Sequence, residues 1–200
     1  MPKQLIFVRH GETIHNREKR LMNWAHDVGE LSEQGRLEAA EVGRKLKELT
    51  IDAMYVSDLL RTRQTAEIIA RETGLKPIHT QYLRERNLGN FGDLTPDEIK
   101  AKWPGQFEQF VDHSNIDWNG LMGESLRDVH TRFREFLELL ESEHPHDNLL
   151  LVTHSGFLYT TLRDVFGLLP PNTWLDVGHT SITIVEKIDG QYTLKSFNQT

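Results

Sequence analysis

LIFVRHGETIHN (residues 5–16) joins a short apolar segment to a basic pair and then, through a glycine, to polar residues. Four consecutive apolar residues of this kind are typical of a strand buried on both faces of a parallel sheet. Arg9 and His10 follow the apolar run directly, and Gly11 gives the backbone room to turn. The stretch therefore predicts an inner strand that carries an arginine and a histidine at its carboxyl end.

Strand and helix patterns alternate along the rest of the chain. Strands are predicted at 4–8, 52–57, 148–154 and 181–188, and helices at 31–49, 59–74, 124–143 and 156–168. A last strand follows the turn at Asp189-Gly190, which predicts a hairpin. Strands that alternate with helices predict an α/β fold with a mostly parallel central sheet, helices on both faces and right-handed crossovers, a three-layer sandwich.

Three of the predicted helices have an identifiable end or an apolar face. Ser32 is a predicted N-cap of the helix 31–49, and Gly74 closes the helix 59–74. For the first helix we expect the buried face to contain Leu37, Ala40, Leu46 and Leu49. For the helix 124–143 the spacing predicts a buried stripe of Leu126, Val129, Phe133, Phe136, Leu137 and Leu140.

Residues 83–123 are less regular, with turn signals around short helical pieces. We expect this segment, about 83–123, to form a small helical cap over the carboxyl edge of the sheet. A chain of 200 residues then forms a single domain, 1–200, with a core of ordinary size.

Composition limits the function. The net charge of −7 does not favour nucleic acid or an anionic membrane as a partner, so an anion site requires a local group of cations. The chain contains no cysteine, which excludes disulfides, thiolate metal ligands and a cysteine nucleophile. No apolar run has the length of a signal sequence or a membrane span, and we expect a cytoplasmic protein. The oligomeric state, monomer or homodimer, stays open.

Three polar clusters follow predicted strands and should meet at one edge of the sheet, where α/β proteins bind ligands. They are Arg9-His10, the run 57–61 that ends in Arg61, and His154-Ser155-Gly156. Forked arginine donors, backbone amides at Gly11 and Gly156, and helix N-termini together are typical of a phosphate site. A histidine can attack phosphorus, and His10 is the better candidate because Gly11 leaves it room, with His154 as its electrostatic partner.

The same residues resemble a known family. VRHGETIHN is similar to the signature of the histidine phosphatase superfamily, the phosphoglycerate mutase-like proteins. Further segments resemble its other markers in the expected order: SDLLRTRQTA (57–66), LRERNLGNFG (83–92), GES (123–125) and VTHSG (152–156). The resemblance runs from Leu5 to at least Ser181, nearly the whole chain.

The resemblance implies roles for these residues. His10 becomes phosphorylated, Arg9, Arg61 and a protonated His154 hold the phosphoryl oxygens, and Asn16 adds a neutral donor. Glu85 protonates the leaving oxygen, for which we expect a raised pKa beside a phosphate. Asn23 and Ser155 are expected to bind substrate. Neither a metal ion nor another cofactor is expected.

Several residues compete for these roles. Arg63 lies two positions from Arg61 on another helix face and is expected at the surface. The rivals of Glu85 as the acid are Glu12, Asp58 and Asp93, and an ion pair of Glu85 with Arg84 or Arg86 is the structural alternative. Histidines that could line the pocket are His15, His26, His113 and His179, of which His26 and His179 are favoured. The pair His144 and His146 is expected to be a solvated turn, and Trp24, Trp103, Phe107 and Trp118 either line the pocket or pack the cap.

Three departures from the family pattern lie near the substrate side. Met22-Asn23 stands where many relatives have Gln-Gly, Phe91-Gly92-Asp93 replaces aromatic-Glu-Gly, and the loop 25–32 is slightly longer than usual. In the acid segment, Asn87-Leu88 replaces the His-Tyr of the mutases, and the mutases' arginine-rich insertion is missing. We therefore expect a phosphatase for small phosphorylated metabolites. The alternatives are a cofactor-dependent phosphoglycerate mutase and, less favoured, a non-catalytic phosphate-binding protein.

Overall fold

The computed structural model describes residues 2–24, 29–144, 147–170 and 175–200. The predictions made for His26, for His146 and for residues 25–28 of the loop 25–32 concern residues outside these ranges. Within them lies one six-stranded sheet in the order β3-β2-β4-β1-β5-β6. Its strands are β1 (Gln4–Arg9), β2 (Ala53–Ser57), β3 (Pro77–Thr80), β4 (Asn148–Thr153), β5 (Ile182–Ile188) and β6 (Gln191–Gln199).

The sheet is mixed. Strands β1, β2, β3 and β4 pair in parallel, and the hairpin β5–β6 adds two antiparallel pairings beside β1. The hairpin turn uses left-handed backbone at Asp189 (φ 50°) and Gly190 (φ 83°), as its sequence predicts. Strand β3 was not predicted: it is a four-residue edge strand with two exposed side chains, too short and too polar to show a buried-strand pattern.

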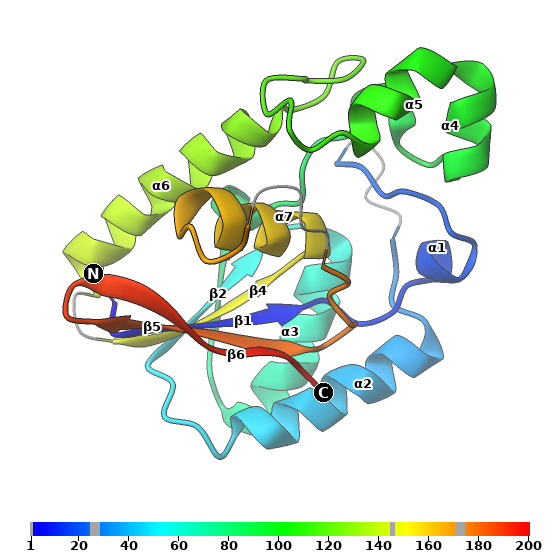
Figure 1. Cartoon of the computed structure of the whole chain (residues 1–200). Coiled ribbons are helices and arrows are strands. Elements are labelled where there is room, and N and C mark those ends of the chain that lie inside the picture. Colours follow the sequence, from blue (N-terminus) through cyan, green and yellow to red (C-terminus); the bar gives the residue numbers. More distant parts are fainter. Residues whose placement is uncertain (1, 25–28, 145–146, 171–174) are drawn as a thin grey trace.

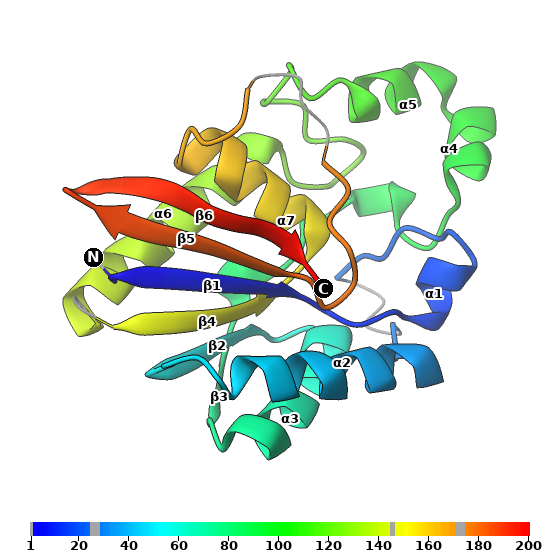
Figure 2. The ribbon, with the colours of Figure 1, turned by 60° about the horizontal axis from the view of Figure 1, so that its bottom comes forward.

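Helices cover both faces of the sheet (Figures 1 and 2), which confirms the three-layer α/β prediction. Helices α2 (Glu33–Leu46) and α3 (Leu60–Thr73) cover one face, and α6 (Leu126–Glu143) and α7 (Ser155–Thr160) cover the other. Along β1 the side chains alternate between the two layers: Leu5 and Phe7 join the core under α6, and Ile6 and Val8 join the core under α2 and α3. Burial on both faces explains the uninterrupted apolar run.

Helix ends and the face of α6 agree with the sequence. The Ser32 hydroxyl caps α2 by accepting from the Gly35 amide, and Gly74 closes α3 with φ 76°. The six apolar residues predicted for the stripe of α6 are all buried. None of the described helices is long and apolar enough to cross a membrane.

The predicted buried face of α2 is wrong in part. Leu37 is 62% exposed and Leu49 lies beyond the end of the helix, and the buried residues are Gly35, Ala39, Val42, Gly43 and Leu46. Small residues face inward because neighbouring backbone comes very close: a Cβ on Gly35 would lie 2.0 Å from the carbonyl oxygen of Glu12. Hydrophobicity alone does not mark such a face.

The segment 83–123 contains short helices, as expected: η2 (Gly89–Phe91), α4 (Pro96–Lys102) and α5 (Pro104–Val111) follow η1 (Gln81–Leu83). In both views α4 and α5 lie at one corner, past the carboxyl end of β1 and near α1 (Ile14–Arg17). Phe91 is buried at their centre, and the rings of Trp103, Phe110 and Trp118 lie 5.6 to 5.8 Å from it. Trp103 and Trp118, for which lining the pocket was the alternative, therefore pack inside the cap.

Candidate active site

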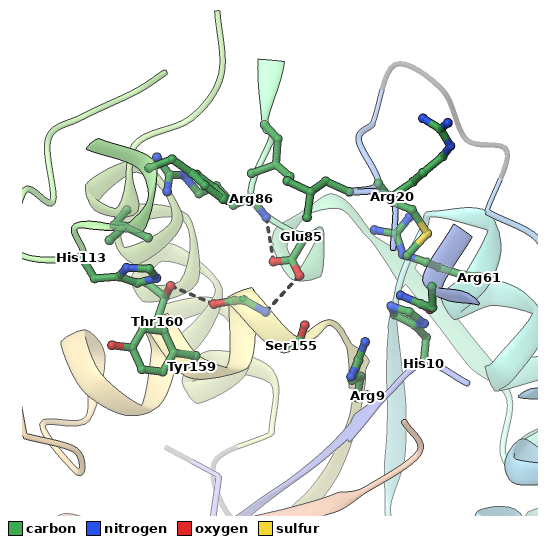
Figure 3. A pocket seen from close by; sticks show the side chains of 17 residues that line it. Arg9, His10, Arg20, Arg61, Glu85, Arg86, His113, Ser155, Tyr159 and Thr160 are labelled. Atoms are coloured by element: carbon green, nitrogen blue, oxygen red, sulfur yellow. Dashed lines mark hydrogen bonds between the residues drawn. The ribbon is translucent and has the colours of Figure 1, made fainter. Parts of the chain in front are cut away.

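The carboxyl ends of β1 and β4 lie side by side, with Arg9 paired to Thr153. A cavity of about 260 Å³ opens at this edge (Figure 3). The residues that line it come from β1 and α1 and the loops that follow them, from α3, α6 and α7, and from the segment 83–123: Arg9, His10, Asn16, Arg20, Leu21, Met22, Arg61, Glu85, Arg86, Leu88, Phe110, His113, Leu126, Ser155, Gly156, Tyr159 and Thr160. Of the predicted site residues, all but His154 and Asn23 are therefore brought together here.

His10 is 2% exposed and held in one orientation. Its backbone amide donates to Thr153 O over 3.0 Å, and Nδ1 donates to Gly11 O over 2.8 Å. Because a carbonyl oxygen can only accept, this contact places the ring proton on Nδ1 and leaves the lone pair on Nε2. Burial, and secondarily the Arg61 and Arg9 guanidinium groups, hold the pKa of His10 well below its ordinary value. The ring is therefore neutral near pH 7, as a nucleophile requires.

Two buried arginines flank this ring. The Arg9 guanidinium donates through Nη1 to Val177 O, and its Nε atom is buried without a hydrogen-bond partner among the described residues. Arg61 is 1% exposed, and its Nε donates to His154 Nδ1 over 3.1 Å. Arg63 does not line the cavity. Two fixed cations beside a neutral histidine make a strongly positive end of the cavity, suited to a phosphoryl group.

His154 lies behind this end and differs from the expectation. It is fully buried, does not line the cavity, and uses both ring nitrogens: Nδ1 accepts from Arg61, and Nε2 donates to Ser57 Oγ over 2.8 Å. Burial, and then the Arg61 charge, hold the pKa of His154 well below its usual range. In this arrangement the ring is neutral rather than protonated, and it orients Arg61. The His10 and His154 rings stand 5.3 Å apart.

The two glycine amides serve the protein rather than a ligand. Gly11 N donates to Thr65 Oγ1 over 3.1 Å, and Gly156 N donates to Glu85 Oε2 over 3.0 Å. Gly11 is needed for close packing, because a Cβ there would lie 2.4 Å from Gly35 O. The expectation that these amides approach a ligand is therefore not met by this structure.

Glu85 faces the cavity from the segment 83–123. Its carboxylate accepts two backbone N–H groups, from Arg86 over 3.0 Å and from Gly156 over 3.0 Å. The alternative, an ion pair of Glu85 with Arg84 or Arg86, is not what the structure shows. Arg84 donates to both carboxylate oxygens of Asp58 over 2.6 Å each, and Arg86 donates to two backbone carbonyls.

The rival acids have other partners. Asp58 is held by Arg84, and Asp93 lies 3.3 Å from His15 Nε2. Glu12 accepts from the Ser32 hydroxyl over 2.6 Å and from Arg17 over 2.7 Å, and the Ser32 bond contributes most to lowering its pKa. None of the three lines the cavity, so Glu85 is the carboxylate that the structure brings to it.

Asn16 and Asn23 have different surroundings. Asn16 lines the cavity, and its Oδ1 accepts from Thr13, which leaves the amide NH₂ as its donor. Asn23 does not line the cavity: its Nδ2 donates to Gly89 O over 2.6 Å, and a Cβ on Gly92 would lie 2.4 Å from its own Cβ. The predicted substrate contact of Asn23 is replaced here by a packing contact, which links two of the three departures from the family pattern.

Of the histidines considered, His113 lines the cavity and His15 does not. The His179 ring stands 6.2 Å from His10 but outside the cavity lining, and burial followed by Arg9 lowers its pKa to about 4. His144 bonds Asp147 and Tyr55 at the opposite end of the sheet. Among the residues that the structure describes, no group of three or more His, Asp or Glu side chains could hold a metal ion.

Some residues of the cavity and its support were not predicted. Tyr159 and Thr160 line it from α7, and Thr65 anchors the turn after His10. Thr65 has a recognisable signal, since it lies four positions after Arg61 and so on the same helix face. Leu88 and Phe110 carry no signal in the sequence, because their place depends on how the cap folds, and Leu126 was predicted only as part of the buried stripe of α6.

Comparisons with known proteins show the family of this chain. A family model described as histidine phosphatase superfamily (branch 1) matches residues 5–200. A 2,3-bisphosphoglycerate-dependent phosphoglycerate mutase from Brucella ovis is 31% identical over 205 residues, which cover 98% of this chain and 97% of the relative. A mycobacterial glucosyl-3-phosphoglycerate phosphatase, solved in complex with VO3, superimposes with a TM-score of 0.87 at 27% identity, covering 99% of this chain and 100% of the other. The Bacillus stearothermophilus protein YhfR gives 0.88 at 29% identity, covering 100% and 98%.

Proposed function

We propose that this chain, which belongs to the histidine phosphatase superfamily (branch 1), hydrolyses small phosphorylated metabolites through a phosphohistidine on His10. One observation carries the proposal. A buried, neutral His10 with its lone pair on Nε2 shares one cavity with Arg9, Arg61 and the carboxylate of Glu85. These are the parts that an in-line displacement at phosphorus requires.

In the first step His10 Nε2 attacks phosphorus, and the bond between phosphorus and the ester oxygen breaks. Glu85 gives its proton to the departing oxygen, which leaves as an alcohol. Arg9 and Arg61 stabilise the negative charge on the three equatorial oxygens, and the Asn16 amide adds a neutral donor. The Nδ1 contact with Gly11 O stabilises the positive charge that the ring gains.

In the second step a water molecule attacks phosphorus on the opposite side from His10. The Glu85 carboxylate takes a proton from this water, and the bond between Nε2 and phosphorus breaks. Inorganic phosphate leaves, and His10 and protonated Glu85 are restored. The step balances with water as the only further reactant.

A second candidate, phosphoglycerate mutase, is favoured by the name of the relative at 31% identity. A bisphosphate needs cations for its second phosphate. Here the two other arginines that line the cavity already donate to protein oxygens, Arg20 to Asp93 O and Glu98, and Arg86 to Glu124 O and Trp118 O. Away from His10 and the two buried arginines, much of the cavity lining is apolar: Leu21, Met22, Leu88, Phe110 and Leu126. These features support the phosphatase.

The test supplies 3-phosphoglycerate with catalytic 2,3-bisphosphoglycerate, and in parallel a panel of phosphorylated metabolites, and measures isomer formation and free phosphate. We expect phosphate release to exceed isomerisation for at least one monophosphate. Isomerisation that dominates would favour the mutase. Phosphate binding without turnover of any substrate would favour a non-catalytic protein.

A further inference from the structure

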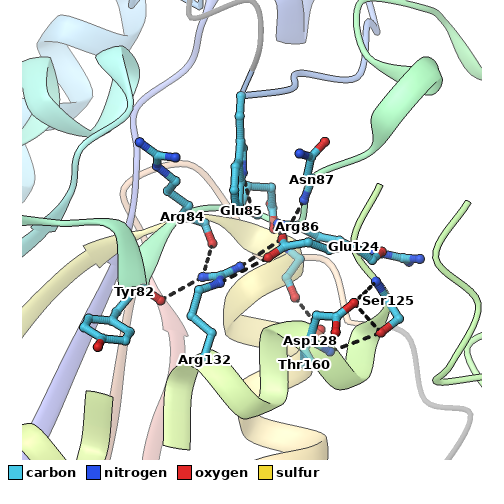
Figure 4. A network of polar contacts seen from close by, with 12 residues as sticks. Tyr82, Arg84, Glu85, Arg86, Asn87, Glu124, Ser125, Asp128, Arg132 and Thr160 are labelled. Carbon is cyan, nitrogen blue, oxygen red and sulfur yellow. Dashed lines mark hydrogen bonds and ion pairs between the residues drawn. The ribbon is translucent and has the colours of Figure 1, made fainter. Parts of the chain in front are cut away.

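Glu85 lies on a stretch of chain with little secondary structure of its own. The helical turn η1 ends at Leu83, and η2 begins at Gly89. Backbone groups between these turns cannot be satisfied by a ladder, so their partners must come from elsewhere. Figure 4 shows where they come from: two side chains, Arg132 and Glu124, surround this stretch.

Arg132, on the second turn of α6, holds the chain on the side before Glu85. Its Nη1 donates to Tyr82 O over 2.7 Å and to Arg84 O over 2.9 Å. The other two nitrogens of the guanidinium face Glu124: Nε lies 3.3 Å from Oε1 and Nη2 lies 3.2 Å from Oε2. One planar group thereby joins the carbonyls of Tyr82 and Arg84 to the Glu124 carboxylate.

Glu124, immediately before the cap of α6, holds the chain on the side after Glu85. Its Oε2 accepts from the Asn87 amide over 2.8 Å, its own amide donates to Asn87 O over 2.8 Å, and its carbonyl accepts from Arg86 Nε over 2.7 Å. Glu85 therefore has a fixed peptide on each side, and the Trp24 indole donates to the Glu85 carbonyl over 2.6 Å.

Burial strengthens the contacts of Arg132 and Glu124. The side chains of Arg132 and Glu124 are 13% and 17% exposed, so water competes weakly for the hydrogen bonds. The two opposite charges compensate each other, so the pair adds no net charge beside Glu85 and acts on it through geometry. Neither residue lines the cavity.

We infer that Arg132 and Glu124 are positioning residues for the general acid: they hold the Glu85 carboxylate where it can pass a proton to the leaving oxygen. This inference rests on the proposed function. A misplacement of about 1 Å is enough to cost a proton transfer much of its rate. Esters that leave as strongly basic alkoxides need that proton most, and esters that leave as weakly basic phenolates need it least.

The experiment compares an alkyl monophosphate with p-nitrophenyl phosphate in the wild type, Glu85→Gln, Arg132→Met and Arg132→Lys. A properly placed acid contributes about 10² to 10⁴-fold. We expect Arg132→Met to lower kcat/KM by about 10²-fold for the alkyl ester and by less than about tenfold for p-nitrophenyl phosphate. Arg132→Lys keeps the charge but not the fork to both carbonyls, so it should fall between.

The matched control is Arg127→Met, since Arg127 lies on the same helix and forms an exposed ion pair with Asp117. It should leave both substrates unchanged. Equal losses on the two esters in Arg132→Met would mean a general structural role and would overturn the inference. So would a double variant Glu85→Gln, Arg132→Met in which the two losses multiply, because residues that act through one carboxylate do not add.

The outcome for the proposed function is separate. A wild type that releases phosphate from neither ester, nor from any metabolite of the panel, contradicts the phosphatase itself. A wild type that is active, with the selective loss in Glu85→Gln but not in either Arg132 variant, contradicts this inference alone. If Arg132→Met does not fold, Arg132→Lys and Glu124→Gln carry the same comparison.

Discussion

The two ends of the cavity differ in structure: one is formed by residues at the ends of the central strands and their helices, the other mainly by loops and α5. The positive end, which the proposed function assigns to phosphate and which we call the phosphate end, contains Arg9 at the end of β1, His10 directly after it and Arg61 at the start of α3. His154, after β4, lies behind them. His10, Arg61 and His154 are at most 2% exposed and are tied to one another or to neighbouring strands. At the outer end, Leu21, Leu88, Phe110 and His113 come from loops and from α5.

The difference separates chemistry from selectivity. Groups proposed to hold a phosphoryl transition state are preorganised by a rigid sheet, where close packing resists small displacements. Groups that contact the rest of the substrate lie on irregular chain, which can change without disturbing the sheet. Changes at the phosphate end should therefore affect every substrate alike, and changes at the outer end should affect substrates unequally.

The largest effect is expected at His10. His10→Ala removes the atom proposed to bond phosphorus, so turnover should fall by about 10⁴-fold or more for all substrates. Acid-labile phosphorylation of the protein should disappear as well. The matched control is His79→Ala, an exposed histidine on the edge strand β3, which should retain both. Rapid acid-labile phosphorylation of the His10→Ala protein would contradict a covalent intermediate on His10.

Arg61→Met should have the next largest effect, about 10² to 10³-fold in kcat/KM, the usual loss for one preorganised donor. The Arg61 charge also helps to lower the pKa of His154, so removing it should raise that pKa. Steady-state kinetics measures the change in kcat/KM, and NMR titration of the His154 imidazole measures the change in its pKa. Arg63→Met, outside the cavity, is the control. An unchanged His154 pKa would show that the Arg61 charge does not contribute to the shift.

The phosphate end was also the more predictable end. Strand β1 and the stripe of α6 have apolar spacing that identifies them, and Arg9, His10 and Arg61 lie where the strands or their following helices place them. Parallel strands bring residues distant in sequence to one edge of the sheet, so the order of strands and helices along the chain is enough to join the clusters into one site. The protonation of His154 was not predictable in this way, since it depends on two contacts inside the core.

What the sequence did not reveal depends on close backbone contacts or on the cap. The inner face of α2 is set by Gly35 and Gly43, which pack because they lack side chains, and an apolar pattern favours Leu37 instead. Asn23 looked like a substrate contact, but its amide is used to fix Gly89 O. In both cases a neighbour remote in sequence decides the role, and no local pattern encodes that neighbour.

At the outer end, Phe110→Ala should change selectivity more than rate. Removing apolar contact from a binding pocket typically costs about 1–3 kcal/mol per group, so substrates that reach this wall should lose about tenfold in kcat/KM. Substrates too small to reach it should change little, and phosphoenzyme formation with p-nitrophenyl phosphate should persist. Val111→Ala, an exposed neighbour on α5, is the control. An equal loss for all substrates would contradict the separation of the two ends.

The smallest effect concerns stability at the phosphate end. Burial and Arg9 lower the pKa of His179 to about 4, against about 6.5 in the unfolded chain. Between these values the unfolded chain binds the proton and the folded protein does not. The free energy of unfolding should therefore fall as the pH drops from about 6.5 toward 4, and should not depend on this group above 6.5.

His179→Asn removes this dependence while His10 and His154, whose pKa values are also lowered, remain in both proteins. The difference between the two proteins therefore isolates one residue. Urea unfolding at pH 7.5 and pH 5 should show that the wild type loses about 1 kcal/mol more than the variant, since His179 is only partly buried. Equal losses would mean that burial and the Arg9 charge do not lower the pKa of His179 in the folded protein.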